Sequence, residues 1–333
     1  MFTEDSLRQY PALVKALTGV PAEAFWPLVA QAGADWADAR ARRLQRPGRR
    51  RALGGGQGVR RPMAVRVAVV LAYLRLHVPQ AVVGWLFGVS QGEVSRELRE
   101  VLPLLSPALP CPAVWDAMPE GQSGPAGALL AVEQLAGGLV LLDATEQRVS
   151  RPGDDATQRR HYSGKKKQHT LKTQLATDGA HRILAISAAV PGATHDKPRC
   201  DALHTLDRLP DGVTVLADKG YQGLAGAVET VALCDTASRE ERRQPRLTAR
   251  TPHKKPRGGE LTEEQRAFNR QLGAVRIRVE HCIGWLKNWA ILAARFRCAH
   301  TLYTAVMQTI CGLVNAQTAR WQASQAPQPA YSA

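Results

Sequence analysis

The stretch LVLLDATEQRVSRP, residues 139–152, leads from an apolar run directly to an acidic side chain. Four aliphatic residues, from Leu139 to Leu142, precede Asp143. Such a run is typical of a strand that is buried on both faces. Because an unpaired carboxylate at the end of a buried strand is costly, the sequence first raises the question of what Asp143 contacts.

A second run of the same kind occurs in GVTVLADKGYQG, residues 212–223, where a short apolar strand ends in Asp218. If the two strands are neighbours in one sheet, Asp143 and Asp218 lie side by side at one end of it. Two carboxylates that close repel each other, and either a shared proton or a divalent cation must offset the repulsion.

The segment between these two strands predicts more of the sheet. HTLKTQLATD and RILAISAAV, residues 169–178 and 182–190, alternate apolar and polar side chains around Asp178-Gly179. Asp-Gly between two such runs is a strong hairpin signal. A helical stretch is expected from about Lys197 to Leu209, so the sequence predicts an α/β domain.

A third acid lies in a helical stretch expected from Glu263 to about Phe296. The sequence RIRVEHCIGWLKNW begins at Arg276 and places Glu280 and Lys287 four and eleven residues later, so all three share one helix face. Two interpretations of Glu280 remain open. It is a surface ion-pair partner of Arg276 or Lys287, or it joins Asp143 and Asp218 in holding Mg²⁺.

The metal interpretation has a definite chemistry. Carboxylate oxygens are the ligands that Mg²⁺ prefers, and two such ions about 3.5–4 Å apart can clamp the attacking and leaving oxygens of a phosphodiester. Three acids in the order strand, strand, helix therefore point to a metal-dependent nuclease, with Asp143, Asp218 and Glu280 as catalytic metal ligands.

The charge of the chain points to a polyanionic partner. Its 333 residues include 44 Lys and Arg against 29 Asp and Glu, a net charge of +15. Nucleic acid is the first candidate, and a membrane partner is not expected. The start of the chain does not resemble a signal peptide, and no run approaches the roughly 18 apolar residues of a spanning helix, so we expect a cytoplasmic, nucleoid-associated bacterial protein. The six cysteines lie far apart without a CxxC pair, which predicts reduced thiols.

A DNA-binding region is expected in the first third of the chain. Residues 40–61 contain nine arginines and no acid, which is typical of either a solvated linker or a phosphate-binding segment. After a helix that begins at Met63, residues 80–101 fit a helix-turn-helix, with Ser90 and Glu93 as a capping box for the second helix. That helix would enter the major groove. Its expected DNA contacts are Gln91, Ser95, Arg96 and Arg99.

Paired amphipathic helices also occur in proteins that never bind DNA, so this interpretation depends on the basic segment beside it. Proline and glycine between residues 105 and 127 suggest a connection. We therefore expect a helical DNA-binding domain at 1–110, a linker at 111–128, a catalytic domain at 129–316 and a tail at 317–333. In the catalytic domain, Lys165, Lys166 and Lys167 are either a solvated loop or contacts to the phosphate backbone.

Taken together, six motifs resemble the bacterial DDE transposases of the insertion-sequence-5 family, the DDE superfamily endonuclease group with an N-terminal helix-turn-helix. The resemblance extends from about Pro62 to Asn315. It is carried, in order, by LDATEQRVSRP, HYSGKKKQHTLKTQLATD, VPGATHDK, LADKGYQG, TPHKKPRGGELTEEQRAFNR and RIRVEHCIGWLKNW.

The resemblance implies a ribonuclease-H-like mixed sheet with three leading antiparallel strands, flanked by helices and preceded by the all-α domain. It also implies that Asp143, Asp218 and Glu280 are the catalytic triad, that two Mg²⁺ ions bind there with Mn²⁺ as a substitute, and that Arg276 and Lys287 belong to a family signature that contacts DNA. The partners implied are double-stranded DNA, as transposon terminal inverted repeats and target, and further copies of the chain on that DNA.

The sequence departs from the family pattern at two positions. Gly273 stands where related transposases often have a tyrosine, so no role of that tyrosine is carried over, and Ala144 replaces a common glycine. Asp196 competes as a metal ligand, with capping of the next helix as its alternative role. Two other functions stay open, a domesticated metal-dependent endonuclease and a catalytically silent DNA-binding regulator.

Overall fold

The computed structural model describes residues 1–44, 61–117, 138–228, 230–234 and 241–325. Most of the arginine-rich segment at 40–61 lies outside the described residues. The chain forms two compact units. Unit 1 comprises Met1–Cys111, Leu286–Ala294 and Cys298–Ala316, and unit 2 comprises Pro112–Trp285, Arg295–Arg297 and the chain from Gln317 onward. In the described ranges, no helix combines the length and apolar character that crossing a membrane requires.

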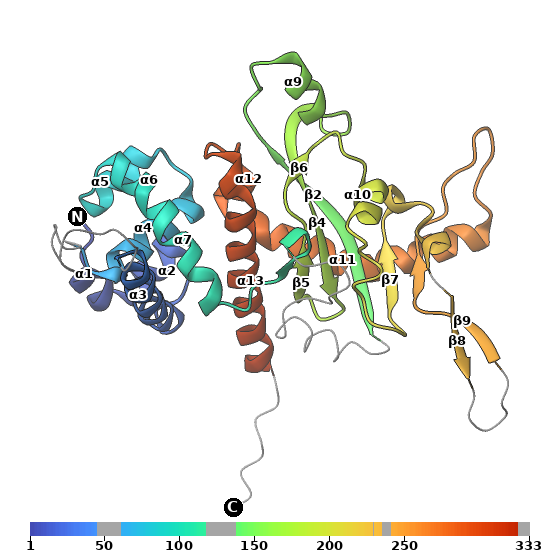
Figure 1. The fold of residues 1–333 in the computed structure, drawn as a ribbon, viewed down its shortest axis with the longest axis horizontal. Helices are drawn as coiled ribbons and strands as arrows, with labels where there is room; N and C mark the ends of the chain where they lie inside the picture. Colours follow the sequence, from blue (N-terminus) through green and yellow to red (C-terminus); the bar gives the residue numbers. More distant parts are fainter. Residues whose placement is uncertain (45–60, 118–137, 229, 235–240, 326–333) are drawn as a thin grey trace, which may run out of the picture. The chain divides into compact units, whose positions relative to one another are not determined.

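Unit 1 is helical and is built around α4 (Met63–Leu76), which buries side chains on all its faces from Ala64 to Leu74. A helix that is buried all round belongs inside a fold. The helices that pack against it are α2 (Pro11–Thr18), α3 (Ala22–Leu44), α5 (Gln80–Phe87), α6 (Gln91–Glu100) and α12 (Ala290–Ala293). The unit also contains α1 (Glu4–Gln9), α7 (Leu102–Leu105) and the first part of α13 (Tyr303–Gln325) (Figure 1).

The helix-turn-helix prediction is confirmed by α5 and α6. The Ser90 hydroxyl accepts a hydrogen bond from the Glu93 backbone N–H, and the Glu93 carboxylate accepts one from the Ser90 N–H, as a capping box requires. The turn between the helices depends on Gly84, because a Cβ atom there would collide with the Val89 carbonyl oxygen. Gly88 ends α5 with φ at 65°, a backbone conformation that glycine adopts without strain.

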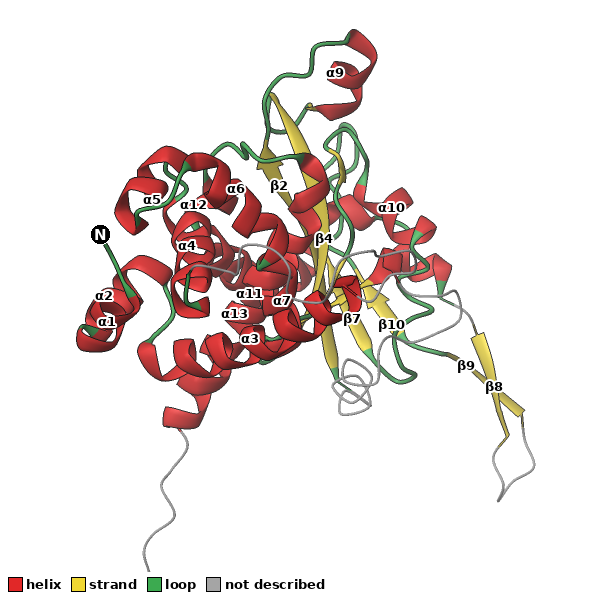
Figure 2. Cartoon of the chain, turned by 60° about the vertical axis from the view of Figure 1, so that its left-hand side comes forward, coloured by secondary structure: helices red, strands yellow, loops and turns green. Residues whose placement is uncertain are grey.

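Unit 2 contains a mixed sheet of strand order β1-β5-β4-β2-β7-β10 (Figure 2). β2, β4 and β5 are antiparallel in turn, and β7 pairs parallel to β2. The mixed sheet flanked by helices, with three leading antiparallel strands, is therefore confirmed. The strands of the sheet are β1 (Ala113–Val114), β2 (Leu139–Arg148), β3 (Tyr162–Ser163), β4 (Gln168–Asp178), β5 (Ile183–Ile186), β6 (Val190–Pro191), β7 (Thr214–Ala217) and β10 (Thr248–Arg250).

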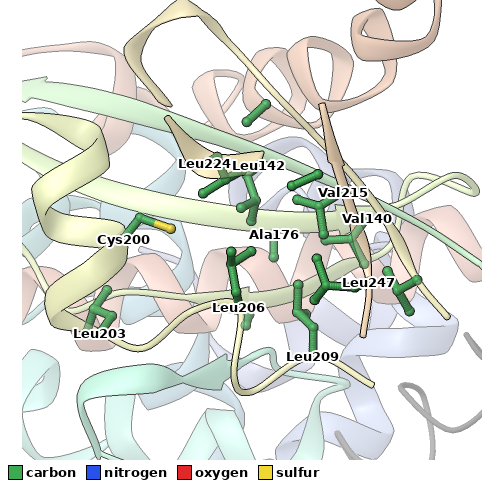
Figure 3. Packing of buried hydrophobic residues seen from close by; sticks show 14 of the residues in the cluster. Val140, Leu142, Ala176, Cys200, Leu203, Leu206, Leu209, Val215, Leu224 and Leu247 are labelled. Atoms are coloured by element: carbon green, nitrogen blue, oxygen red, sulfur yellow. The ribbon is translucent and has the colours of Figure 1, made fainter. Parts of the chain in front are cut away.

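The alternation of β2 divides its side chains between two cores. Val140 and Leu142 pack on one face with residues of α10 (Asp196–Ala202) and of the chain that follows it (Figure 3). Leu139 and Leu141 point to the other face, which α11 (Glu263–Lys287) covers through Leu272, Val279 and their neighbours. Because successive side chains of a strand alternate between faces, Asp143 follows Leu141 toward α11.

Three elements differ in length from the sequence predictions. β2 does not end before Asp143 but continues to Arg148, because β4 pairs with it along its whole length. The helix expected to reach Leu209 ends at Ala202, where the chain turns and His204 takes a positive φ of 49°. The helix expected to reach Phe296 ends at Lys287, and Trp289 is extended before the short α12 begins.

The connection expected at 111–128 is partly structured, because Ala113 and Val114 form β1 and pair with β5. α13 continues past residue 317 to Gln325, where the tail was expected. Two further parts extend from the sheet. One carries α9 (Asp155–His161) between β2 and β4, and the other is the ribbon of β8 (Thr230–Cys234) and β9 (Glu241–Pro245) (Figures 1 and 2).

Five short 3-10 helices complete the described chain. They are η1 (Ser106–Ala108), η2 (Trp115–Ala117), η3 (Lys219–Tyr221), η4 (Leu224–Ala227) and η5 (His300–Leu302). η3 directly follows β7, so the chain turns at once after Asp218.

Candidate active site

Asp143 and Asp218 lie side by side on neighbouring parallel strands. Leu142 of β2 is in register with Ala217 of β7, and each aspartate is the next residue of its own chain segment. Leu141 belongs to the apolar cluster under α11, so Asp143, two residues further along β2, points to that face. Asp218 directly follows β7 and is close enough for its charge to act on Asp143. The sheet thus places two acidic side chains together, as the sequence pattern predicts.

Both aspartates line a pocket of about 250 Å³ in unit 2. Its wall includes four acids and two lysines, with the loop at residues 192–196 on one side and the β3–β4 turn on another. The charged lining residues are Asp143, Glu146, Asp196, Asp218, Lys165 and Lys172. Their mixture of clustered carboxylates and nearby lysines suits a site that binds a cation together with an anionic substrate.

The Asp143 side chain is only 16% exposed. Burial raises the pKa of Asp143 to about 6, and the negative charge of Asp218 contributes to the rise. The Ala144 backbone N–H, which donates to Oδ1 at 2.7 Å, and the positive charges of Arg276 and Lys165 act in the opposite direction. A proton and a cation therefore compete for Asp143 near neutral pH.

Arg276 of α11 supplies the direct partner of Asp143, since its Nη2 donates to Oδ2 over 3.0 Å. The Arg276 side chain is 11% exposed, and its Nε atom is buried without a hydrogen-bond partner among the described residues. This ion pair was not predicted from the sequence, which assigned Arg276 to DNA binding.

Glu280 lies one helical turn after Arg276 on the same face of α11, and its side chain is exposed. It does not line the pocket. Within the described part of the chain it forms no hydrogen bond or ion pair, so the surface ion pair with Arg276 or Lys287 is not formed. Lys287, at the end of α11, donates instead to the Leu292 carbonyl oxygen over 2.6 Å.

Gly220 leaves an open space between two of the pocket's carboxylates. Asp196 Oδ2 lies 2.5 Å, and Asp218 Oδ1 3.0 Å, from the position a Cβ atom would take at Gly220, so these oxygens are at most 5.5 Å apart, the sum of the two distances. Asp218 Oδ1 also accepts a hydrogen bond from the Gly220 N–H at 2.7 Å. Oxygen atoms around a space that any larger residue would fill are compatible with a hard divalent cation.

The pocket also contains a lysine that the sequence analysis missed. Lys172 of β4 donates to Asp196 Oδ1 at 2.9 Å and to the Thr194 carbonyl oxygen at 2.7 Å, and its Nζ lies 4.0 Å from Glu146. A lysine in an otherwise buried strand, directly opposite Glu146 in the register, was the available signal. Asp196 occupies the first turn of α10 but makes no capping hydrogen bond, because the cap residue is His195.

In the described residues, no three His, Cys, Asp or Glu side chains form a group that could hold one metal ion. The structure brings Asp143 and Asp218 together, adds Asp196 and Glu146 to their pocket, and leaves Glu280 outside it. A metal ion there would take protein ligands chiefly from Asp143 and Asp218, with its remaining positions open to water or phosphate.

The predicted DNA-contacting residues occupy two separate regions. On α6 of unit 1, Gln91, Arg96 and Arg99 are exposed and Ser95 is half-buried. In unit 2, Lys165, Lys166 and Lys167 are exposed in the turn between β3 and β4, and Lys165 lines the pocket.

A buried arginine of α4 holds α6, the helix that carries Gln91, Arg96 and Arg99. Arg66 of α4 is 2% exposed and bonds Glu97 at 2.8 Å and Glu100 at 3.0 Å. The two glutamates lie on the inner side of α6, and the pair leaves Arg96 and Arg99 on its outer side. This arrangement keeps the basic side chains available to a partner.

Comparison with known proteins finds a family match for the helix-turn-helix region of unit 1 and another that includes the pocket of unit 2. The family model described as "DDE superfamily endonuclease" matches residues 142–315, and the model "Helix-turn-helix of DDE superfamily endonuclease" matches residues 62–111. A curated protein from Microchaete diplosiphon, "Probable transposase for insertion sequence element IS702", is 31% identical over 181 residues, which are 54% of this chain and 58% of that protein. The chain thus matches little more than half the length of this relative. No solved structure matches the chain.

Proposed function

The chain belongs to the DDE superfamily endonucleases, and on this basis we propose that it is a DNA transposase of the insertion-sequence-5 type. In this proposal the chain binds the terminal inverted repeats of an insertion sequence and catalyses strand cleavage and strand transfer. The observation that carries the proposal is the pair Asp143 and Asp218, on neighbouring parallel strands and within one pocket.

Enzymes of this family generally use divalent metal ions, and we propose that Asp143 and Asp218 hold Mg²⁺ here, with Mn²⁺ as a substitute. When bound, two such ions would activate water for cleavage and stabilise the charge on the leaving oxygen. Glu280 is proposed as the third acid of the triad. Its support is its place on α11, the helix that covers the sheet face to which Asp143 points and that supplies Arg276 to Asp143.

One cationic side chain holds a proposed catalytic carboxylate, and another lines the pocket. Arg276 holds Asp143 in position through its Nη2 donor. Lys165 lies at the pocket wall and can hold the phosphodiester near the aspartates. Such contacts would orient the phosphodiester for in-line attack in both steps. In cleavage, water attacks the phosphorus at the end of the element and the 3′ oxygen leaves as a free hydroxyl. In strand transfer, this hydroxyl attacks a phosphodiester of the target DNA and displaces the 3′ oxygen of that bond.

The helix-turn-helix of unit 1 is proposed to recognise the DNA ends. The outward residues of α6 would read base edges in the major groove, while Arg96 and Arg99 also meet the phosphate backbone. Because α6 of unit 1 recognises the DNA sequence and the pocket of unit 2 cleaves the strand, the same pocket can act on the transposon end and on the target DNA. Assembly of several copies on that DNA is part of the proposal, since two transposon ends must be paired.

A cleavage assay on DNA that carries the repeats flanking the gene tests the proposal. Purified full-length chain should nick that DNA at the repeat ends with Mg²⁺ and should not nick it with a chelator. Asp143→Asn and Asp218→Asn should bind the same DNA without cutting it. Metal-dependent cleavage without preference for the repeats would favour a repurposed endonuclease, and binding without cleavage by the unmodified chain would favour a silent regulator.

A further inference from the structure

The chain between β2 and β4, residues 149–167, forms an arm that extends beyond both strands and carries α9 (Figures 1 and 2). The arm contains six basic residues and two acids. All six basic side chains are exposed, and none forms an ion pair with another described residue. They are Arg151, Arg159, Arg160, Lys165, Lys166 and Lys167.

The arm has an ordered internal structure. Asp154 caps α9 by accepting from the Thr157 N–H at 2.8 Å, and Arg151 donates to the Gln158 side chain at 2.8 Å. β3 pairs with the start of β4, and the Lys167 N–H donates to the Ser163 carbonyl oxygen to close the turn between them. Like charges held in fixed positions repel one another unless a polyanion neutralises them.

The base of the arm is part of the pocket wall. Ser163, Gly164 and Lys165 line the pocket together with Asp143 and Asp218. Ala193, another residue of the pocket wall, donates its backbone N–H to the Arg160 carbonyl oxygen of the arm at 3.1 Å. A phosphodiester chain that reaches the aspartates therefore passes directly beside the arm.

We propose that this arm binds the phosphate backbone of duplex DNA on one side of the scissile phosphate. The inference rests on the proposed function, because it takes the pocket to be the cleavage site. Its basis is charge complementarity. Unpaired cations on a fixed element, continuous with the pocket, match the regular row of phosphates on a duplex.

The test measures binding of a fluorescent duplex of about 30 base pairs by the full-length chain in chelator, over a range of salt concentrations. The double variant Arg159→Gln/Arg160→Gln removes two charges from the arm and keeps helix-forming side chains. Loss of two phosphate contacts should reduce the slope of log K against log salt by about 2 and weaken binding roughly tenfold or more.

The matched control is Arg182→Gln/Arg320→Gln. Both arginines are exposed residues of unit 2, and Arg182 follows the end of β4 that lies away from the arm. This control loses the same net charge and should keep the slope of the unmodified chain. Hydroxyl-radical footprinting of the arm variant should show lost protection only beside the cleaved phosphate.

The arm inference is overturned if the arm variant keeps the slope and the footprint of the unmodified chain, or loses no more than the control. If the unmodified chain still cuts DNA in a metal-dependent way, only the arm inference fails and the proposed function stands. If the unmodified chain binds no duplex, the arm inference is overturned, and the cleavage assay then decides the proposed function separately.

Discussion

Arg276 donates a hydrogen bond to Asp143 over 3.0 Å, from the helix that covers the sheet to the strand at its centre. The pair answers the question that the apolar run before Asp143 raises. A carboxylate at this buried position needs a positive partner, and the structure provides a guanidinium on the side chain's own face of the sheet. A divalent cation that binds Asp143 would add to this positive charge or displace it.

The raised pKa of Asp143 predicts a pH dependence of metal binding and of cleavage. Burial raises this pKa from an ordinary 3.8 to about 6, so below pH 6 a proton occupies the carboxylate that the cation needs. Cleavage should rise with pH through about 6, and more divalent cation should move the midpoint to lower pH. Arg276→Gln should move it higher, because the arginine lowers this pKa. A profile that is flat from pH 5 to 8 would contradict the prediction.

The same shift predicts an effect on stability. Because the folded-state pKa of Asp143 is above the unfolded value, its ionisation disfavours the folded state. The protonated Asp143 therefore contributes to the free energy of unfolding below about pH 4, and this stabilisation is lost as the pH rises to about 6. In Asp143→Asn the loss between these values should be smaller than in the unmodified chain. Urea unfolding at several pH values, each with chelator, measures the difference.

Gly220→Ala tests the open space between Asp196 and Asp218. The added Cβ would lie 2.5 Å from Asp196 Oδ2 and 3.0 Å from Asp218 Oδ1, so these side chains must move. Because they are flexible, the variant should fold with a melting temperature near that of the unmodified chain. Its divalent-cation affinity, measured by calorimetry, should fall about tenfold or more, in the range seen when metal ligands are misplaced.

Gly226→Ala serves as its control, since a Cβ atom there meets nothing within 4 Å. This variant should bind the cation as the unmodified chain does. Equal affinities for both glycine variants would mean that the cation binds away from Gly220.

Charge reversal on α6 should reduce binding of the terminal repeat more than it reduces cleavage of unrelated DNA. Arg96→Glu/Arg99→Glu should weaken binding of the terminal repeat by about thirtyfold or more, because two contacts are lost and each lost contact to a base costs about 1–3 kcal/mol. Metal-dependent nicking of unrelated DNA should change less, because the pocket lies in unit 2. Lys15→Glu, an exposed change elsewhere in unit 1, is the control. Equal loss of both activities would show that α6 is not the recognition helix.

Local signals in the sequence were sufficient to predict much of the fold. The capping box at Ser90, the hairpin at Asp178-Gly179 and the apolar strand before Asp218 each depend on neighbouring residues, and each forms as expected. Helix and strand ends were less predictable. β2 passes Asp143 because β4 pairs with it, and such pairing depends on residues far away in the sequence.

The candidate site was predictable only in part, for the same reason. Asp143 and Asp218 could be paired from two similar strand endings. The Arg276 ion pair and the bonds of Lys172 depend on how α11 and α10 pack on the sheet, which periodicity alone does not determine. Glu280 was assigned by its place on a helix face, and a helix face specifies a direction but not the distance to the strands.

The last prediction decides which acid completes the site with Asp143 and Asp218. Glu280 is exposed and has no ion-pair partner among the described residues, so Glu280→Gln should leave the melting temperature unchanged. If Glu280 is the third catalytic acid, this variant should bind DNA normally while Mg²⁺-dependent cleavage falls by orders of magnitude, as it should for Asp143→Asn. Asp196→Asn is the matched comparison, because its amide oxygen can still accept the hydrogen bond from Lys172. We expect this variant to keep most of its cleavage. Near-normal nicking by folded Glu280→Gln, together with an inactive Asp196→Asn, would exclude Glu280 and assign the third position to Asp196, which already lies in the pocket.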